Sequence, residues 1–150
     1  MSIKGLAQTL AAKYGTRDPF RIAEAMDYLV IFTPLSGVRG FYQYLQRCHV
    51  IYIDSGLEEE DARRVCAHEL GHSVLHRGLN RLFMDTRTIM VTSRYEKEAN
   101  YFAADLLFDD YDLQDFLSVS LPDAARCLGL SEDVTAYRLS SVQPVLMPLY

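Results

Sequence analysis

The sequence predicts an α+β fold, in which a small three-stranded sheet packs on helices and further helices lie at both ends of the chain. Three stretches rich in β-branched and aromatic residues predict the strands, at 28–33, 41–45 and 49–54. Apolar residues recur at helical spacing in much of the remainder. A length of 150 residues is that of one domain. We therefore expect a single domain over residues 1–150, with C-terminal helices at about 111–140 packed on it.

The composition excludes several classes of protein. The chain has 15 Lys and Arg against 20 Asp and Glu, and this net charge of −5 disfavours direct binding to nucleic acid, which depends on cationic side chains displacing counterions. No apolar run approaches the roughly 18 residues that cross a bilayer, and polar residues in the first segment argue against a signal peptide. The three cysteines fit neither a disulfide framework nor a CxxC metal site. We expect a cytoplasmic protein without direct nucleic-acid or membrane contacts.

Two short helices are expected before the sheet. Residues 2–14 form the first, and Gly15 ends it. Asp18 is suited to the N-cap of the second helix and Pro19 to its first turn, where a missing backbone N–H costs nothing. Within the sheet, residues 46–48 are expected to form the hairpin loop between the second and third strands. The pattern does not indicate which strand is outermost.

A long helix is predicted from about residue 57 to residue 76. Ser55 and Glu58 have the spacing of a capping box, in which each side chain bonds a backbone N–H near the other. Acidic residues crowd the first turn, where the helix dipole favours negative charge. A loop is expected to follow this helix over residues 79–93.

This helix carries the pattern H-E-x-x-H, from His68 through Glu69 to His72. Two histidines four residues apart lie on one face of a helix, so their imidazoles can meet at one metal ion. Glu69 follows the first histidine and is placed to take a proton from a water that the metal activates. His76 lies roughly 12 Å beyond His68 along the helix axis, too far to share the same ion. We expect His76 to cap the end of the helix instead.

A catalytic metal site of this kind needs a third protein ligand, and the next predicted helix, at 94–107, is its expected source. On a helical wheel, Glu96 falls roughly 50° from the centre of the buried face and Glu98 roughly 110° from it. We expect Glu96 to be the ligand and Glu98 to point toward solvent, with Glu98 kept as the alternative. Asn100 lies one turn after Glu96 and is expected to hydrogen-bond a ligating histidine.

The rest of the chain has three short helical patterns, at about 113–117, 122–128 and 133–139. The last two resemble a helix-turn-helix with Gly129 at the turn. The second of these helices carries acidic residues and only one basic residue, Arg138, which is a poor match to phosphates and base edges. We expect these helices to pack against the domain rather than to bind DNA.

The HELGH helix, its spacing to the segment E-x-E-A-N-x-F-A and the preceding small sheet resemble the ImmA/IrrE family of metallopeptidases, over roughly residues 6–139. The resemblance implies a compact zincin-like fold in a single metallopeptidase domain. Family members often end the third-ligand helix with a Leu-Met-Pro-like sequence, whereas this chain has Leu-Phe-Asp-Asp at 107–110. This departure lies near the expected substrate groove and does not affect the metal ligands.

The resemblance assigns the metal to His68, His72 and Glu96, the general base to Glu69, and a supporting position to Asn100. Zinc suits such ligands, although manganese or iron would accept them. The implied activity is metal-dependent cleavage of a protein substrate, typically a helix-turn-helix repressor in this family. An extended substrate would add to a sheet edge, either in the second strand or in the third. The alternative is a binding or regulatory module of the same fold with little turnover.

Overall fold

The computed structural model describes residues 1–76 and 89–144, with the backbone alone at 89–92, and these residues form two compact units. The first unit runs from Met1 to Leu107, and the second begins at Phe108. The predicted α+β fold is confirmed, because the three predicted strands form one sheet among helices. The packing of the helices at 111–140 on the rest of the chain stays a prediction.

The predicted roles of Gly15 and Asp18 at the ends of the two N-terminal helices are confirmed. Helix α1 (Ile3–Tyr14) starts after the N-cap Ser2 and ends at Gly15, which has the left-handed conformation. Helix α2 (Pro19–Ala25) has Asp18 as its N-cap, and the Asp18 carboxylate accepts a backbone N–H of the first turn. Local capping chemistry therefore accounts for both segments.

The sheet has the order β1-β3-β2, with β3 (Cys48–Asp54) in the centre. Strand β1 (Leu29–Thr33) pairs with β3 in parallel, and β2 (Gly40–Leu45) pairs with β3 in antiparallel fashion. Gln46 and Arg47 form the hairpin turn with φ angles of 50° and 65°, the backbone geometry of a two-residue turn. Among the described residues, the edge strands of the sheet are therefore β1 and β2, and the third predicted strand is central.

Helix α3 (Glu59–Leu75) carries the HELGH sequence, but its N-terminus differs from the prediction. The N-cap is Glu58, and no side-chain capping bond forms, so the predicted capping box of Ser55 and Glu58 is wrong. The backbone N–H of Ser55 bonds the carbonyl of Thr33 at the end of β1, which keeps Ser55 in the turn that leaves the sheet. Acidic side chains still fill the first turn of the helix, as expected.

Helix α5 (Ile89–Leu107) begins earlier than predicted, so residues 89–93 are helical and not part of a loop. The other residues of that expected loop, 79–88, lie outside the described residues. The predicted apolar face of the helix is confirmed by burial of Ala99, Phe102, Ala103 and Leu106.

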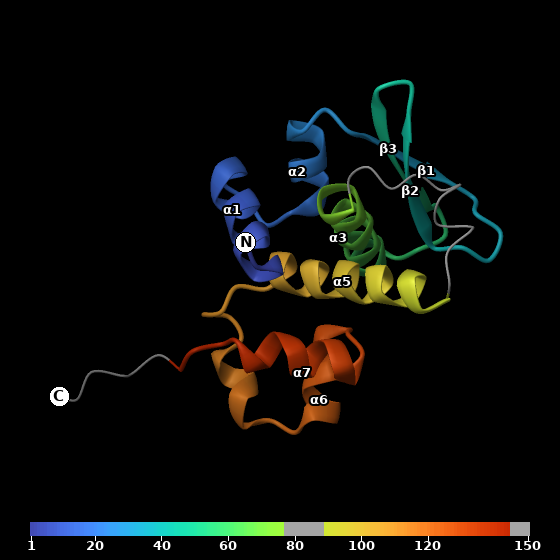
Figure 1. Ribbon diagram of the computed structural model, residues 1–150. Helices are drawn as coiled ribbons and strands as arrows, with labels where there is room; N and C mark the ends of the chain where they lie inside the picture. Colours follow the sequence, from blue (N-terminus) through green and yellow to red (C-terminus); the bar gives the residue numbers. More distant parts are fainter. Residues whose placement is uncertain (77–88, 145–150) are drawn as a thin grey trace. The chain divides into compact units, whose positions relative to one another are not determined.

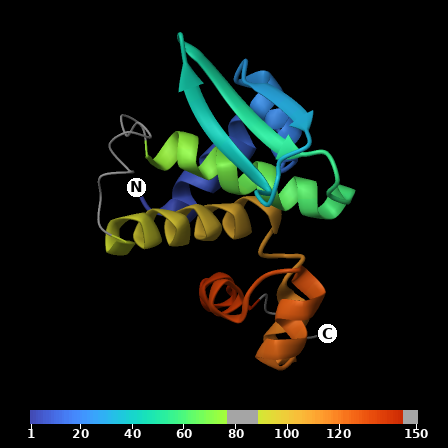
Figure 2. The ribbon, with the colours of Figure 1, turned by 90° about the vertical axis from the view of Figure 1, so that its right-hand side faces the viewer.

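Helix α3 lies between the sheet and α5, and Figures 1 and 2 show this layering from two directions. Helix α2 packs against α3, and α1 packs against α5. The core between these layers is apolar and includes Ile51, Ile53, Cys66, Leu70 and Phe102. The helix with the HELGH sequence is thus held on both sides by packing.

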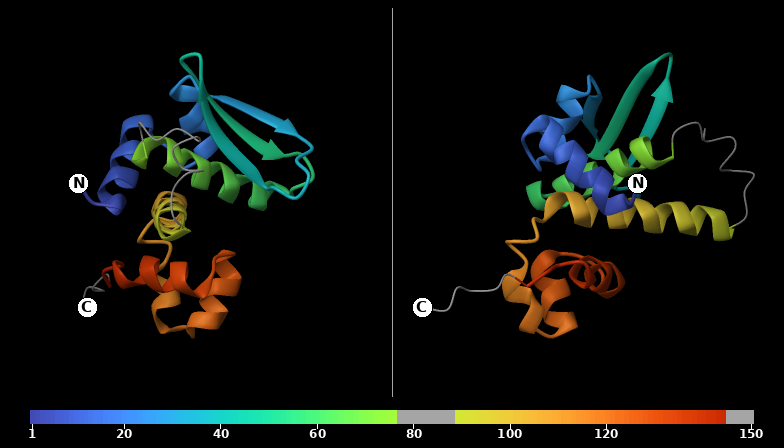
Figure 3. Two further views of the ribbon diagram at one scale, coloured as in Figure 1. Left: turned by 45° about the vertical axis from the view of Figure 1, so that its right-hand side comes forward. Right: turned by 60° about the vertical axis from the view of Figure 1, so that its left-hand side comes forward.

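Helices α3 and α5 cross each other and do not run side by side, as the left view of Figure 3 shows. Gly71 lies at their contact, because a Cβ atom there would be 3.0 Å from Phe102 Cδ1 and 3.3 Å from Ala99 Cα. The glycine within HELGH therefore permits the close approach of α5 to the helix that carries both histidines.

The second unit contains a short 3-10 helix, η1 (Gln114–Ser118), followed by α6 (Leu121–Leu128) and α7 (Glu132–Ser140). These elements match the three helical patterns of the sequence closely. Gly129 has the left-handed conformation and ends α6, at the position predicted for the turn.

The basic residue of α7, Arg138, is only 1% exposed. Its guanidinium donates hydrogen bonds to the Phe108 carbonyl at 2.7 Å and to the Asp110 carboxylate at 2.6 Å. Arg138 therefore stabilises the interior of the second unit and is not presented to solvent. None of the helices in the described residues has the length and apolar character of a membrane span.

Candidate metal centre

His68 and His72 lie one turn apart on α3, with their rings edge to face and the ring centroids 4.8 Å apart. Only 18% and 13% of their side-chain surfaces are exposed. The Nε2 atoms of both rings contact a single carboxylate that comes from α5. The i, i+4 spacing of the sequence thus produces the shared face that the motif predicts.

The carboxylate belongs to Glu96, whose Oε2 lies 3.0 Å from His68 Nε2 and whose Oε1 lies 2.8 Å from His72 Nε2. Ligand atoms bound at about 2.0–2.2 Å around a tetrahedral zinc ion lie roughly 3.3 Å apart. The observed spacing is slightly tighter than this, as hydrogen bonds require. Two imidazoles and a carboxylate are therefore of the right type and almost at the spacing needed to hold a zinc ion.

Glu98, the alternative carboxylate, forms an ion pair with Arg94 on its own helix at 3.1 Å. Its side chain is 28% exposed, whereas that of Glu96 is 51% exposed. The expected order of exposure is thus reversed. Glu96 is distinguished from Glu98 by its contacts with the histidines and not by deeper burial.

The charges of this cluster act on one another. Hydrogen bonds from His68 and then His72 hold the pKa of the Glu96 carboxyl well below its usual range. Burial alone would lower the pKa of His68, but the bond to Glu96 and the negative charge of Glu69 outweigh it and raise that pKa. Asn100, an exposed residue of α5, also hydrogen-bonds His68 and raises the pKa of His68 to a smaller extent. In the absence of a metal, the contacts with the two imidazole Nε2 atoms hold the Glu96 carboxylate in place.

Glu69 lies next to this cluster and is 7% exposed. One of its carboxylate oxygens is 3.8 Å from His68 Nε2, and the ligand atoms of Glu69 and the two histidines all lie within 4.8 Å of one another. Gly40, the first residue of β2, is its neighbour, because a Cβ atom there would lie 3.8 Å from Glu69 Cγ. The open edge of the sheet at β2 therefore begins beside the Glu69 side chain.

His76 has the predicted position at the end of α3 and also makes a contact with His72 that was not predicted. It is the C-cap of α3, and its backbone N–H bonds the His72 carbonyl, but its ring also lies 3.0 Å from His72, Nδ1 to Nδ1. Burial, and then the positive charge of His72, lower the pKa of His76 to about 4. The signal available in the sequence was its spacing of four residues from His72, which places both rings on one face.

The remaining histidine, His49, lies elsewhere in the first unit. Its Nδ1 contacts the hydroxyl of Tyr42, and its ring stacks on Tyr28 at a centroid distance of 4.4 Å. It belongs to an aromatic cluster of the sheet, in keeping with its expected place on a strand.

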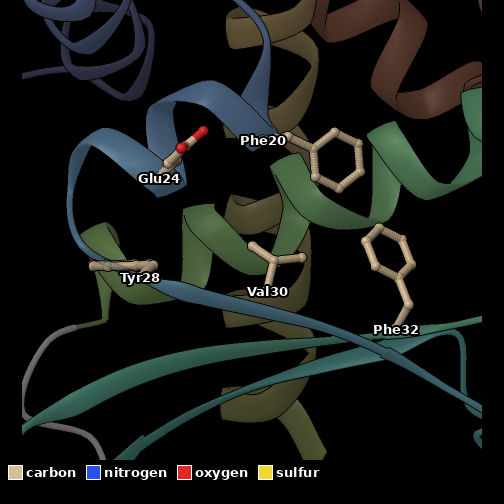
Figure 4. Close-up of a pocket in the computed structure, with 5 residues that line it drawn as sticks. All are labelled: Phe20, Glu24, Tyr28, Val30 and Phe32. Carbon is tan, nitrogen blue, oxygen red and sulfur yellow. The ribbon is translucent and has the colours of Figure 1, made fainter.

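A hollow of about 260 Å³ lies between α2 and the edge strand β1, and Figure 4 shows its lining. It is lined by apolar and aromatic side chains and one carboxylate: Phe20, Glu24, Tyr28, Val30 and Phe32. Its volume is below the range of about 300–1,000 Å³ that is usual for small-molecule sites, and it includes none of the clustered His and Glu side chains. The hollow is therefore not the candidate metal centre.

The α+β fold with a helix-borne HExxH cluster defines a protein of the metallopeptidase class. Residues 23–140 match the Peptidase_M78 family model, described as the IrrE N-terminal-like domain. The chain belongs to this family.

Among the proteins similar to the chain are two curated relatives and one solved structure. Uncharacterized immunity region protein 2 of Bacillus phage phi105 is 39% identical over 135 residues, which cover 88% of this chain and 85% of that protein. Metallopeptidase ImmA of Bacillus subtilis (strain 168) is 26% identical over 146 residues, covering 93% of this chain and 85% of that protein. A Mycobacterium tuberculosis transcriptional regulator has a TM-score of 0.60 at 16% identity, over 94% of this chain. This chain spans 47% of that regulator, and the likeness concerns the fold alone.

Proposed function

We propose that the chain is a metal-dependent endopeptidase in which His68, His72 and Glu96 hold a zinc ion. The observation that carries the proposal is the position of the two Glu96 carboxylate oxygens, within 3.0 Å of the two imidazole Nε2 atoms. Three protein ligands with a further position left open are typical of catalytic zinc sites. Manganese or iron would accept the same ligands, and elemental analysis distinguishes the three metals.

Glu69 is the proposed general base. When bound, the metal supplies Lewis acidity, which polarises a peptide carbonyl and makes a water molecule more acidic. Glu69 takes a proton from the attacking water and passes it to the amine that leaves. The burial of Glu69 and its 3.8 Å distance from His68 Nε2 support this role, because they place the carboxylate beside the proposed ligand atoms.

The proposed substrate is an extended segment of a protein that adds to the open edge of β2. Two observations support this edge: β2 is outermost in the sheet, and its first residue, Gly40, lies beside Glu69. Backbone hydrogen bonds along such an edge hold a peptide extended, with its carbonyl groups in a defined register. Strand β3 is central and has no free edge to offer.

A helix-turn-helix transcriptional repressor is the proposed partner. The resemblance to the ImmA/IrrE family implies such substrates, and the names of two relatives refer to an immunity region and to a metallopeptidase ImmA. This part of the proposal rests on analogy with relatives and not on the site itself.

The test compares wild-type protein with Glu69→Gln, Glu96→Ala and Glu98→Ala. We expect elemental analysis to find the metal in all but Glu96→Ala. We expect Glu69→Gln to cleave a repressor from the same genomic neighbourhood at least about 100-fold more slowly than wild type. Full cleavage by Glu69→Gln would reject the mechanism, and metal loss in Glu98→Ala alone would move the ligand assignment. Binding of a repressor by the metal-loaded protein without cleavage would indicate the alternative, a regulatory module.

A further inference from the structure

The contact between His72 and His76 has a consequence for the metal centre. We infer that His76 is a positioning residue, whose Nδ1 atom holds His72 in the orientation and tautomer that leave its Nε2 atom for the metal. The inference rests on the proposed function, because it assigns His72 as a ligand. It adds a residue that neither the HExxH pattern nor the Glu96 contact includes.

The geometry supports a hydrogen bond of defined direction. The Nδ1 atoms of His72 and His76 are 3.0 Å apart, and the Nε2 atom of the same His72 ring faces Glu96 at 2.8 Å. Two facing ring nitrogens form a hydrogen bond only when one carries a hydrogen and the other does not. When His72 binds a metal through Nε2, its hydrogen must lie on Nδ1, so His72 donates and His76 accepts.

The surroundings of His76 argue that its nitrogen has a role beyond packing. The residue is 9% exposed, and its Nε2 atom is buried without a hydrogen-bond partner among the residues that the structure describes. Burying a polar atom in this way disfavours folding, and an apolar ring of similar shape would avoid that cost. A histidine at this position is therefore explained by what its other nitrogen does for His72.

Helix α5 also contacts the His72–His76 pair, through two adjacent residues. The Tyr95 ring packs on the His76 ring with centroids 4.5 Å apart, and the residue after Tyr95 is Glu96. Glu96 thus contacts His72 directly, and Tyr95 contacts it through His76. Two adjacent residues of one helix fix both ends of the His72 ring.

The test uses two substitutions that separate the ring from its nitrogen. His76→Phe keeps a ring against Tyr95 and removes the hydrogen-bond acceptor. His76→Asn removes the ring and keeps an oxygen near the position of Nδ1. For the full chain we expect zinc affinity, measured by competition with a chelator, to fall roughly 10- to 100-fold in His76→Phe. We expect His76→Asn to bind zinc nearly as tightly as wild type.

A second readout separates positioning from simple packing. We expect metal-free His76→Phe to unfold in urea at the same concentration as metal-free wild type or at a higher one, while its cobalt-loaded form has an altered visible spectrum. Unchanged zinc affinity in His76→Phe, or an equal loss in both variants, would overturn the inference. If wild type itself binds no zinc, the proposed function fails and the inference fails with it.

Nitrogen-15 NMR of zinc-loaded wild-type protein provides a test without substitutions, in case a variant does not fold. We expect a hydrogen on His72 Nδ1 and on His76 Nε2, and none on His76 Nδ1. A hydrogen on His76 Nδ1 in the zinc-loaded protein would show that the bond runs the other way or is absent, and the inference would be wrong.

Discussion

Cys66 shows how strongly the first unit controls the chemistry of a single side chain. It lies on α3 two residues before His68 and is fully buried. Burial, aided by the negative charges of Asp18 and Glu69, raises the pKa of its thiol far above the ordinary 9.0. Because the thiolate is the reactive form, Cys66 is inert as long as the unit stays folded.

We predict that iodoacetamide at mildly alkaline pH modifies Cys48 and Cys127 in the native protein and leaves Cys66 unmodified. The first two are exposed, whereas Cys66 is buried. Mass spectrometry of peptides from native and urea-unfolded protein measures this difference, and all three thiols should react after unfolding. Equal rates at Cys66 and Cys48 in the native protein would contradict the prediction.

The raised pKa of the Cys66 thiol also makes the free energy of unfolding depend on pH, with a sign that can be predicted. As the pH rises above about 9, the unfolded chain releases the Cys66 proton while the folded chain retains it, so the free energy of unfolding decreases. We expect the Cys66→Ala variant, measured by urea unfolding across this pH range, to lack that part of the decrease. A variant with the same pH slope as wild type would rule out Cys66 as its source.

At the site, residue-level reasoning reached Glu96 and stopped short of His76. The helical wheel describes only a residue's own helix, so it ranked Glu96 and Glu98 by burial and obtained the wrong order of exposure. What brings Glu96 to the imidazoles is the crossing of α3 and α5, which is a tertiary property. The distance of His76 from His68 excludes it as a ligand, but its spacing of four residues from His72 is what brings the two rings into contact.

At the scale of elements, Gly71 links stability to the candidate metal centre. We predict that Gly71→Ala lowers the free energy of unfolding by about 1–3 kcal/mol, because the new Cβ atom would press on Phe102 and on the backbone at Ala99. Helix α5 must shift to relieve these contacts, and Glu96 shifts with it. We therefore also expect weaker zinc binding. Urea unfolding of the metal-free protein and a chelator competition measure the two effects.

A matched control for this prediction is Gly56→Ala. The nearest atom to its new Cβ would be a carboxylate oxygen of Asp54 at 3.3 Å, and no backbone atom lies as close. The other Asp54 oxygen accepts a hydrogen bond from the Leu35 backbone N–H, so the carboxylate need give way by only a few tenths of an ångström. We expect this variant to change stability by less than about 1 kcal/mol and to leave zinc affinity unchanged. Similar effects in both glycine variants would remove the helix crossing as the explanation.

The elements were predictable where short-range chemistry decides them. Ser2, Gly15 and Asp18 cap their helices as local rules require. The capping box before α3 failed because the backbone of Ser55 is engaged by β1, a partner distant in sequence. The early start of α5 was not predicted, because local rules assign the β-branched residues among 89–92 a slightly low helix propensity.

At the scale of the whole molecule, net charge and the burial of one arginine act together against DNA binding. The chain carries a net charge of −5, and Arg138 of α7 is directed into the second unit by its bonds to Phe108 and Asp110. We predict no salt-dependent binding of the full chain to duplex DNA in fluorescence anisotropy. Arg126→Glu, which alters an exposed arginine on α6, should leave this result unchanged. Affinity that rises steadily as salt is removed would contradict the prediction.

The boundary between the two compact units is not marked in the sequence. The chain has no linker rich in Gly or Ser at the boundary between Leu107 and Phe108. The second unit has its own small core, which includes Leu113, Leu128 and Val142. Contacts between distant segments decide whether an apolar residue joins the core of the first unit or that of the second. Local composition does not contain this information.

Within the part of the chain that the structure describes, no strand pairs with the outer edge of β1, and its residues Leu29 and Phe32 are 55% and 54% exposed. Unpaired backbone groups flanked by apolar side chains are a template on which molecules polymerise strand by strand. We therefore expect the protein to aggregate through this edge strand at high concentration. Natural proteins often place charged residues at such edge strands, which prevents this association. We expect Leu29→Lys to reduce such association while leaving the proposed metal site unchanged.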